Sequence, residues 1–205
     1  MTDQSVTERK HGAILDAART VFSRDGYAAS SVEDVAAEAG IGKGTVYLYF
    51  KSKEELYLAA LARDFRALTA KAREEMENVP TFREKVEAFF RVRLAYCREH
   101  EDFLRIYLSE YGSMSAKTPI SKELRRLHRD NMRYVASVVQ TALVRREIRK
   151  VSAPALAAAL FDISKGLVER RLLGWKEFQV RGEIAFATDL LWQGIGNGTP
   201  TRRER

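Results

Sequence analysis

Long stretches of helix-forming residues constrain this chain more than any other feature of its sequence. Only four prolines interrupt its 205 residues, and Ala, Leu, Glu, Lys and Arg are abundant throughout. No segment alternates β-branched and polar residues between two turn signals, which is the pattern of a half-buried strand. The sequence therefore predicts an all-α fold of about nine helices.

Three short helices are predicted near the N-terminus and six further helices after them. Gly26 and Gly40 end the first two, because glycine readily adopts the left-handed conformation of a helix C-terminal cap. Ser31 offers the N-cap of the second helix, with Asp34 at capping-box spacing. The expected ranges are 7–24, 32–39, 43–50, 52–78, from Pro80 onward, 101–113, 121–150, 154–174 and 180–195.

The third helix is short and has two chemically different sides. Val46 and Phe50 are apolar and one turn apart, so they should face inward. The opposite side has two pairs one turn apart, Lys43 with Tyr47 and Gly44 with Leu48, so its N-terminal residues are small or polar. This arrangement is typical of a helix that enters the major groove of DNA.

The segment SVEDVAAEAG at 31–40, continued by IGKGTVYLYFKSKEEL at 41–56, closely resembles the DNA-binding domain of the TetR family of transcriptional regulators. FSRDGY at 22–27 is similar to the end of that family's first helix. The resemblance covers about the first 56 residues continuously. It implies a helix-turn-helix domain at 1–56 and a helical ligand-binding and dimerisation domain at 57–196. The residues at 197–205 are themselves typical of a flexible basic tail.

The resemblance also implies which side chains meet DNA. Four of them would mostly hold backbone phosphates, which fix register rather than sequence, and Leu48 can touch a thymine methyl group. The implied DNA-binding residues are Ser31, Gly42, Lys43, Gly44, Thr45, Tyr47, Leu48, Tyr49 and Lys53, of which Ser31, Tyr47, Tyr49 and Lys53 are the phosphate contacts.

The net charge of the chain is not the evidence for the DNA-binding prediction. The chain has a formal charge of +7, but residues 1–56 contain seven Lys or Arg and nine Asp or Glu. The excess of basic residues therefore lies outside the segment assigned to DNA, and the motif is the evidence.

Aromatic residues after position 80 indicate either a packed core or an effector site. Arg93 and Glu110 lie on the same stripes, and a buried charge needs a partner from the protein or from a ligand. Mutual pairing of the two is one interpretation, and ligand contact is the other. The candidate effector-binding residues are Phe89, Arg93, Tyr96, Phe103, Tyr107, Glu110 and Tyr111.

A second candidate for an anionic ligand is the basic face of the helix at 121–150. This range contains nine basic and three acidic residues. Such a face is usually only solvated, and the alternative is a site for a ligand such as a coenzyme A thioester. The residues that share the face are Lys122, Arg126, Arg129 and Arg133.

The helices at 154–174 and 180–195 are apolar on more than one side. Such a helix is either central or shared between subunits, and the family resemblance implies a four-helix homodimer interface. The candidate interface residues are Leu156, Leu160, Ile163 and Leu167. A two-fold dimer would place two recognition helices on a palindromic site, about one turn of DNA apart.

We therefore expect a cytoplasmic, homodimeric repressor that binds palindromic operator DNA and is released by a small hydrophobic or amphipathic effector, with acyl-CoA-like molecules as one option. An effector-independent architectural or partner-recruiting DNA-binding protein is the alternative. Enzymatic activity is not expected, because the three histidines are scattered and no nucleophile–base or metal spacing is apparent. Cys97 has no partner for a disulfide, and neither a cofactor, a metal nor a membrane span is predicted.

Overall fold

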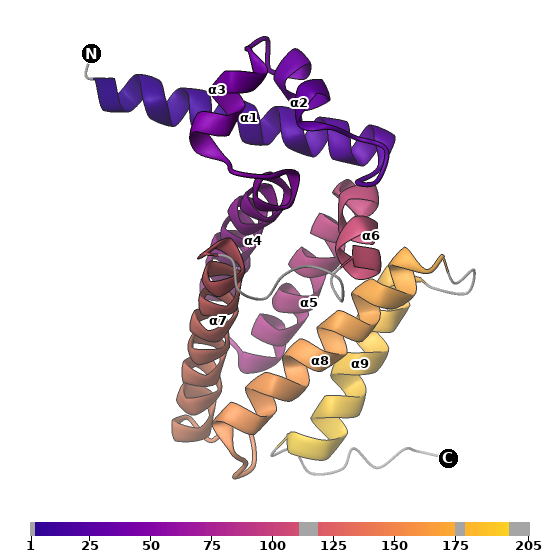
Figure 1. The fold of residues 1–205 in the computed structure, drawn as a ribbon. Helices are drawn as coiled ribbons and strands as arrows, with labels where there is room; N and C mark the ends of the chain where they lie inside the picture. Colours follow the sequence, from indigo (N-terminus) through magenta and orange to yellow (C-terminus); the bar gives the residue numbers. More distant parts are fainter. Residues whose placement is uncertain (1–2, 111–118, 175–178, 197–205) are drawn as a thin grey trace. The chain divides into compact units, whose positions relative to one another are not determined.

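The computed structural model describes residues 3–110, 119–174 and 179–196, and this part of the chain forms nine α-helices without a strand (Figure 1). The all-α prediction is confirmed. Among the described helices, none has the length and apolar composition that a membrane span requires. The helices are α1 (Asp3–Asp25), α2 (Val32–Glu38), α3 (Lys43–Tyr49), α4 (Lys53–Glu77), α5 (Phe82–Glu99), α6 (Glu101–Glu110), α7 (Pro119–Val144), α8 (Ala153–Leu172) and α9 (Val180–Ile195).

Two compact units divide these helices. Of the described residues, 3–66, 100–110 and 119–127 belong to the first unit, and 67–99, 128–174 and 179–196 belong to the second. The helices α4 and α7 each contribute residues to both units. The functional division at residue 56 stays a prediction, and the predicted tail at 197–205 lies outside the described residues.

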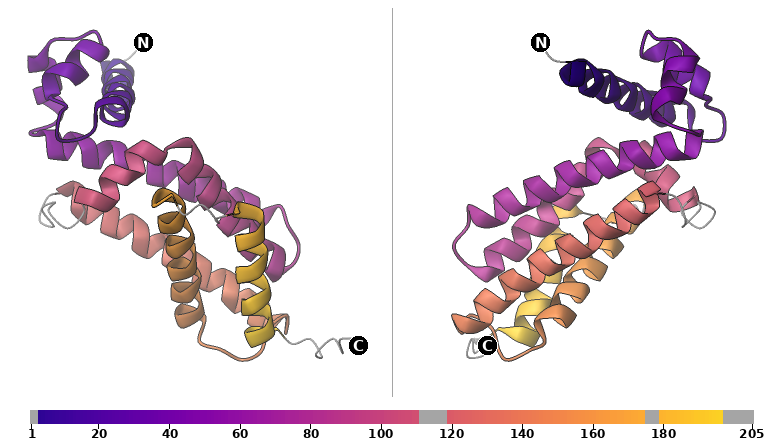
Figure 2. Two further views of the ribbon diagram at one scale, coloured as in Figure 1. Left: turned by 90° about the vertical axis from the view of Figure 1, so that its right-hand side faces the viewer. Right: turned by 60° about the vertical axis from the view of Figure 1, so that its left-hand side comes forward.

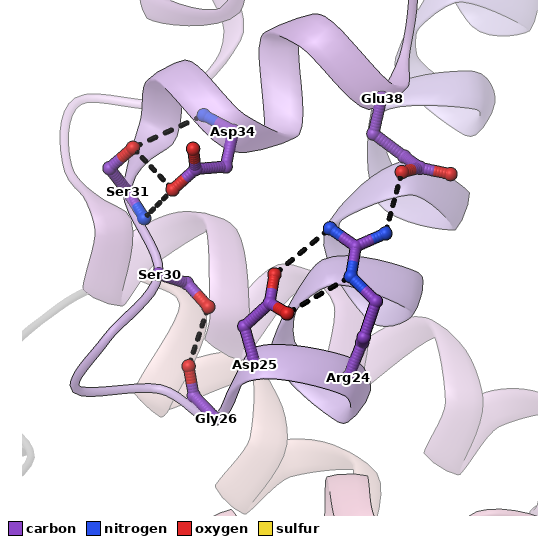
Figure 3. Close-up of polar contacts among 7 residues, drawn as sticks. All are labelled: Arg24, Asp25, Gly26, Ser30, Ser31, Asp34 and Glu38. Atoms are coloured by element: carbon purple, nitrogen blue, oxygen red, sulfur yellow. Dashed lines mark hydrogen bonds and ion pairs between the residues drawn. The ribbon is translucent and has the colours of Figure 1, made fainter.

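In the first unit, glycine caps and a capping box set the ends of the short helices. Gly26 and Gly40 have φ angles of 78° and 64°, which L side chains rarely adopt. The Gly40 N–H bonds to the Ala37 carbonyl and the next N–H to the Ala36 carbonyl, which completes a Schellman cap on α2. Ser31 and Asp34 form the reciprocal capping box that their spacing predicts (Figure 3).

Tyr57 on α4 is the centre of the apolar core of this unit. Its buried ring lies 5.6 Å from Phe22 on α1 and 4.9 Å from Phe103 on α6. Its hydroxyl donates to the Phe103 carbonyl at 3.1 Å, so the only polar atom of the side chain is satisfied. This residue therefore binds three helices together.

Lys53 fastens the loop between α1 and α2 to the start of α4. Its Nζ donates to the carbonyls of Tyr27 at 2.6 Å and Ser30 at 2.9 Å, and lies 4.5 Å from the centre of the Tyr27 ring. A half-buried ammonium that donates to two carbonyls holds the loop by charge-assisted hydrogen bonds. The sequence did not indicate this structural role.

In the second unit, α5 packs against both α8 and α9, which lie side by side (Figure 1, Figure 2). The rings of Phe89 and Phe161 meet edge to face at 5.1 Å, and Phe82 lies 6.0 Å from Trp192. The first turn of α5 receives a distant cap, because the Glu147 carboxylate accepts the Phe82 N–H at 2.6 Å.

The predicted C-terminal end of the helix at 121–150 is wrong, because α7 ends at Val144. Arg146 has a φ of 57°, and the Glu147 N–H bonds to the Ala142 carbonyl in a second Schellman cap. The chain then meets the C-terminal end of α9, where the Arg149 N–H donates to the Ile195 carbonyl at 2.8 Å. Helix propensity favours continuing through these residues, and the tertiary contact with α9 overrides it.

Replacing Glu147 by Ala should destabilise the second unit. The substitution leaves an N-terminal N–H of α5 without its charged acceptor, which costs about 1–2 kcal/mol of unfolding free energy. Glu74→Ala is the control, since Glu74 forms an exposed ion pair with Lys71 and should change stability by less than about 0.5 kcal/mol. Urea unfolding measures both, and equal values for the two variants would contradict the capping role.

Replacing Lys53 by Ala should destabilise the first unit by about 1–3 kcal/mol, because two loop carbonyls lose their donor. The neighbouring Lys51 has an exposed side chain, so Lys51→Ala should leave the thermal midpoint unchanged. Thermal unfolding followed by circular dichroism compares the two variants. A normal midpoint for Lys53→Ala would show that the loop does not depend on this side chain.

Candidate nucleic-acid interface and ligand site

The helix α3 presents a mixed polar and apolar surface to solvent. Val46 and Phe50 are buried, which confirms their predicted inward direction. Leu48 is 83% exposed and Tyr47 is 44% exposed on the other side. These two side chains give the outer side of α3 both an apolar surface and a hydroxyl group in solvent.

Lys43, at the first position of α3, is held by Glu33 of α2. Its Nζ donates to a carboxylate oxygen of Glu33, and both side chains lie at the surface. This hydrogen bond raises the pKa of Lys43 and lowers the pKa of Glu33. Lys43 therefore stays cationic and lies next to the exposed face of α3. To bind a DNA phosphate, it would have to give up its hydrogen bond with the Glu33 carboxylate. The sequence analysis missed Glu33, whose ten-residue separation from Lys43 gives no local signal.

Ser31 lies at the N-terminus of α2, where its side chain accepts the Asp34 N–H at 3.1 Å and donates to the Asp34 carboxylate at 2.7 Å (Figure 3). The hydrogen bonds from Ser31 lower the pKa of Asp34. Arg24 forms a two-pronged pair with Asp25 and reaches Glu38 at 3.1 Å, so it links α1 with α2. The Ser31–Asp34 contacts therefore cap the N-terminal end of α2, and Arg24 holds its C-terminal end at Glu38.

Gly42 and Gly44 leave room for another molecule to approach the backbone of α3 closely. Gly42 is the N-cap and has no side chain to cap the helix. A Cβ atom added at Gly42 or Gly44 would meet no heavy atom within 4 Å, so the fold itself does not require glycine at either position. A small surface beside exposed Leu48 is compatible with a groove that approaches the backbone.

The remaining DNA-binding candidates are partly enclosed by the protein. Thr45 and Tyr49 are half-buried, and the Tyr49 ring lies 5.9 Å from His11 of α1. Burial, and then the charges of Arg63 and Arg66, lower the pKa of His11. Lys53 donates to loop carbonyls, as described above. Its contact with phosphate, like the other assigned DNA contacts, stays a prediction.

The candidate effector residues are divided between the two units. Phe89, Arg93 and Tyr96 belong to the second unit, and Phe103 belongs to the first, where it packs on Tyr57. Phe103 is therefore a core residue of its own unit. Tyr111 and the side chains of Tyr107 and Glu110 lie outside the described residues.

The basic face of α7 lies in solvent. The described side chains that the sequence placed on it are all exposed, and Arg133 pairs with Asp130 at 3.3 Å. This favours the solvated interpretation of the face. The four residues are Lys122, Arg126, Arg129 and Arg133.

Three of the four residues predicted for the dimer interface expose little surface in the single chain. Leu156, Leu160 and Leu167 are buried inside the chain, and Leu160 is only 1% exposed, so they have almost no surface to give a partner. Ile163 is half-buried and lines a groove of about 580 Å³ between α8 and α9. Exposed apolar residues that the sequence analysis did not select also line this groove: Leu173, Phe186 and Leu190.

Comparison with known proteins places these features in a family. Residues 14–60 match the family model of the bacterial regulatory proteins of the tetR family. The uncharacterized HTH-type transcriptional regulator YhgD of Bacillus subtilis (strain 168) is 31% identical over 132 residues, which cover 63% of this chain and 67% of YhgD. The fatty acid metabolism regulator protein of the same strain is 34% identical over 77 residues, 38% of this chain and 40% of that protein.

A solved structure agrees over most of the chain. The transcriptional regulator FadR from Bacillus subtilis in complex with stearoyl-CoA has a TM-score of 0.74 at 17% identity, and the match covers 89% of this chain and 97% of that one. At this identity the likeness shows the fold. The helix-turn-helix match and the similarity to YhgD show that this chain belongs to the TetR family of transcriptional regulators.

Proposed function

We propose that this TetR-family regulator is a homodimeric repressor that binds palindromic operator DNA through α3 and is released by an amphipathic effector with a fatty acyl chain. The exposed outer side of α3 is the observation that carries the proposal. Leu48 and Tyr47 face solvent there, Lys43 lies beside them, and Val46 anchors the opposite side in the core. The cytoplasmic location and the repressor role stay predictions.

A second copy of the chain is the proposed partner of the groove between α8 and α9. Phe186 is 67% exposed and Leu190 is 60% exposed, so an isolated chain would leave a large apolar surface in water. Pairing about a two-fold axis would cover the same surface on both copies. It would also supply the two recognition helices that a palindromic site requires.

Arginine and aspartate side chains join α1 to α4, so they could couple a movement of α4 to a movement of α1. Arg63 on α4 donates to the Gly12 carbonyl at 3.1 Å and to Asp16 at 2.8 Å, both on α1. Arg19 on α1 lies 3.6 Å from buried Asp64 on α4. A shift of α4 would therefore carry α1 with it, and a ligand produces that shift only if it binds one conformation more tightly.

The fatty acyl part of the proposal is supported by the relative that is a fatty acid metabolism regulator protein and by the aromatic, apolar interior of the second unit. The direct test selects an operator from random DNA with the purified protein, then measures operator affinity with and without lipid extracts. Release by an acyl compound supports the proposal. Operator binding that no extract changes would favour the effector-independent alternative.

Leu48→Ala should weaken binding to the selected operator about fivefold to tenfold, because an apolar contact with a thymine methyl is lost. Affinity for non-specific DNA and its dependence on salt should not change, since no phosphate contact is removed. The thermal midpoint should also be unchanged, because the side chain is 83% exposed.

The matched control removes the methyl group from the DNA instead. Uracil at the contacted thymine should weaken binding of the original protein by the same factor and leave binding of Leu48→Ala unaffected. Equal losses for both proteins on the uracil operator would show that Leu48 does not contact that methyl group.

Phe186→Asp should convert the protein to a monomer, because a charge would be buried against the apolar groove of the partner. Sedimentation equilibrium should give about 23.3 kDa for the variant and twice that mass for the original protein. Val144→Asp is the control, since Val144 is equally exposed and apolar but lies at the end of α7, outside the groove. A dimeric Phe186→Asp variant would contradict this interface.

A further inference from the structure

Arg93 on α5 places a cation between aromatic rings inside the second unit. Its guanidinium carbon lies 5.4 Å from the centre of the Phe89 ring, one turn earlier on α5, and 5.3 Å from the Phe161 ring on α8. Both rings are buried, and His128 of α7 meets Phe161 edge to face at 5.4 Å. Helices α5, α7 and α8 therefore all contribute to the surroundings of this one charge.

The guanidinium has no anionic partner among the residues that the structure describes. Its Nε is screened from water and donates to no acceptor there. Asp162 follows Phe161 on α8, but its side chain is exposed and no ion pair joins it to Arg93. The Arg93 side chain is half-buried as a whole. Its two terminal nitrogens, unlike Nε, are not fully screened from water. Those nitrogens remain available to a ligand.

The charge persists at neutral pH. Burial lowers the pKa of Arg93 to about 10, which leaves the group protonated at pH 7. Burial, and then the nearby Arg93 charge, lower the pKa of His128, so the imidazole is mainly neutral at that pH. The site therefore carries one positive charge, and it comes from Arg93.

We propose that Arg93 receives the anionic headgroup of the effector, with a carboxylate as the best-fitting group. The proposal rests on the proposed effector function and specifies the chemistry of the effector. The aromatic surfaces already hold a cation, so a quaternary ammonium ligand would meet repulsion rather than an empty aromatic cage. A carboxylate fits the planar fork of a guanidinium with two parallel hydrogen bonds.

The phosphates of an acyl-CoA have the same anionic chemistry, so the test must separate the two sources. Isothermal titration calorimetry on the full-length protein would compare four ligands with the same ten-carbon chain: decanoate, decanol, decyltrimethylammonium and decanoyl-CoA. The protein should bind decanoate at least about tenfold more tightly than decanol, the ratio expected for one charge-assisted interaction, and decyltrimethylammonium most weakly.

Arg93→Met should abolish the preference for decanoate over decanol, since methionine fills similar space without charge. Arg91→Met is the control, because Arg91 lies on the same helix but is exposed and pairs with Glu75 at 3.4 Å. Arg91→Met should keep the full preference. Tighter binding of decanoyl-CoA than of decanoate, lost in Arg93→Met, would support the site with phosphate as the anion.

Thermal unfolding separates a ligand role from a structural one. If Arg93 binds the ligand, the thermal midpoint of ligand-free Arg93→Met should equal or exceed that of the original protein, because an unpaired charge is removed. A lower midpoint with an unchanged decanoate preference would overturn the proposal. Equal binding of decanoate and decanol by the original protein would also overturn it. Operator binding tests the proposed function separately, because a protein that binds its operator and is released by decanol keeps that function.

Discussion

The packing of Tyr57 against three other aromatic rings is the interaction on which the first unit depends. Its ring meets Phe22, Tyr27 and Phe103, and its hydroxyl bonds to the Phe103 carbonyl. Since α1 packs against both α2 and α6, and α2 packs against α3, the position of α3 follows from that of α1. Tyr57 of α4 therefore helps to hold the exposed face of α3 in place, although it is not part of that face.

Local sequence signals predicted most of this fold because the forces that end helices are local. A left-handed glycine, a capping serine and an apolar stripe act over four or five residues, and α2, which has these signals, begins and ends within one residue of its predicted bounds. The end of α7 was missed for the opposite reason. Arg146 takes a left-handed conformation that its residue type disfavours, and contacts with α9 hold the segment after it.

At the candidate site, the sequence predicted which side chains of α3 are buried, but not the contacts that hold the others. Spacing alone showed that Val46 faces inward and Leu48 outward. It did not show that Glu33 holds Lys43, or that Lys53 donates to carbonyls more than twenty residues away. Helix α8 gives the same lesson, because a helix with two apolar sides does not reveal which side its own chain covers. The covered side contains Leu160. The other side contains Ile163, which lines a groove together with Phe186 of α9.

The unpaired charge of Arg93 connects stability with ligand binding. A buried donor without an acceptor costs free energy in the unliganded protein, and an apolar side chain of similar volume would avoid that cost. An anion that supplies the missing acceptor removes the cost as it binds, so the second unit becomes more stable when it is occupied. Because the cost is removed only in the conformation where the anion reaches the guanidinium, the ligand necessarily favours that conformation over the others. In the proposed function, the charge that would select the effector would thus also supply the differential affinity that release from DNA requires.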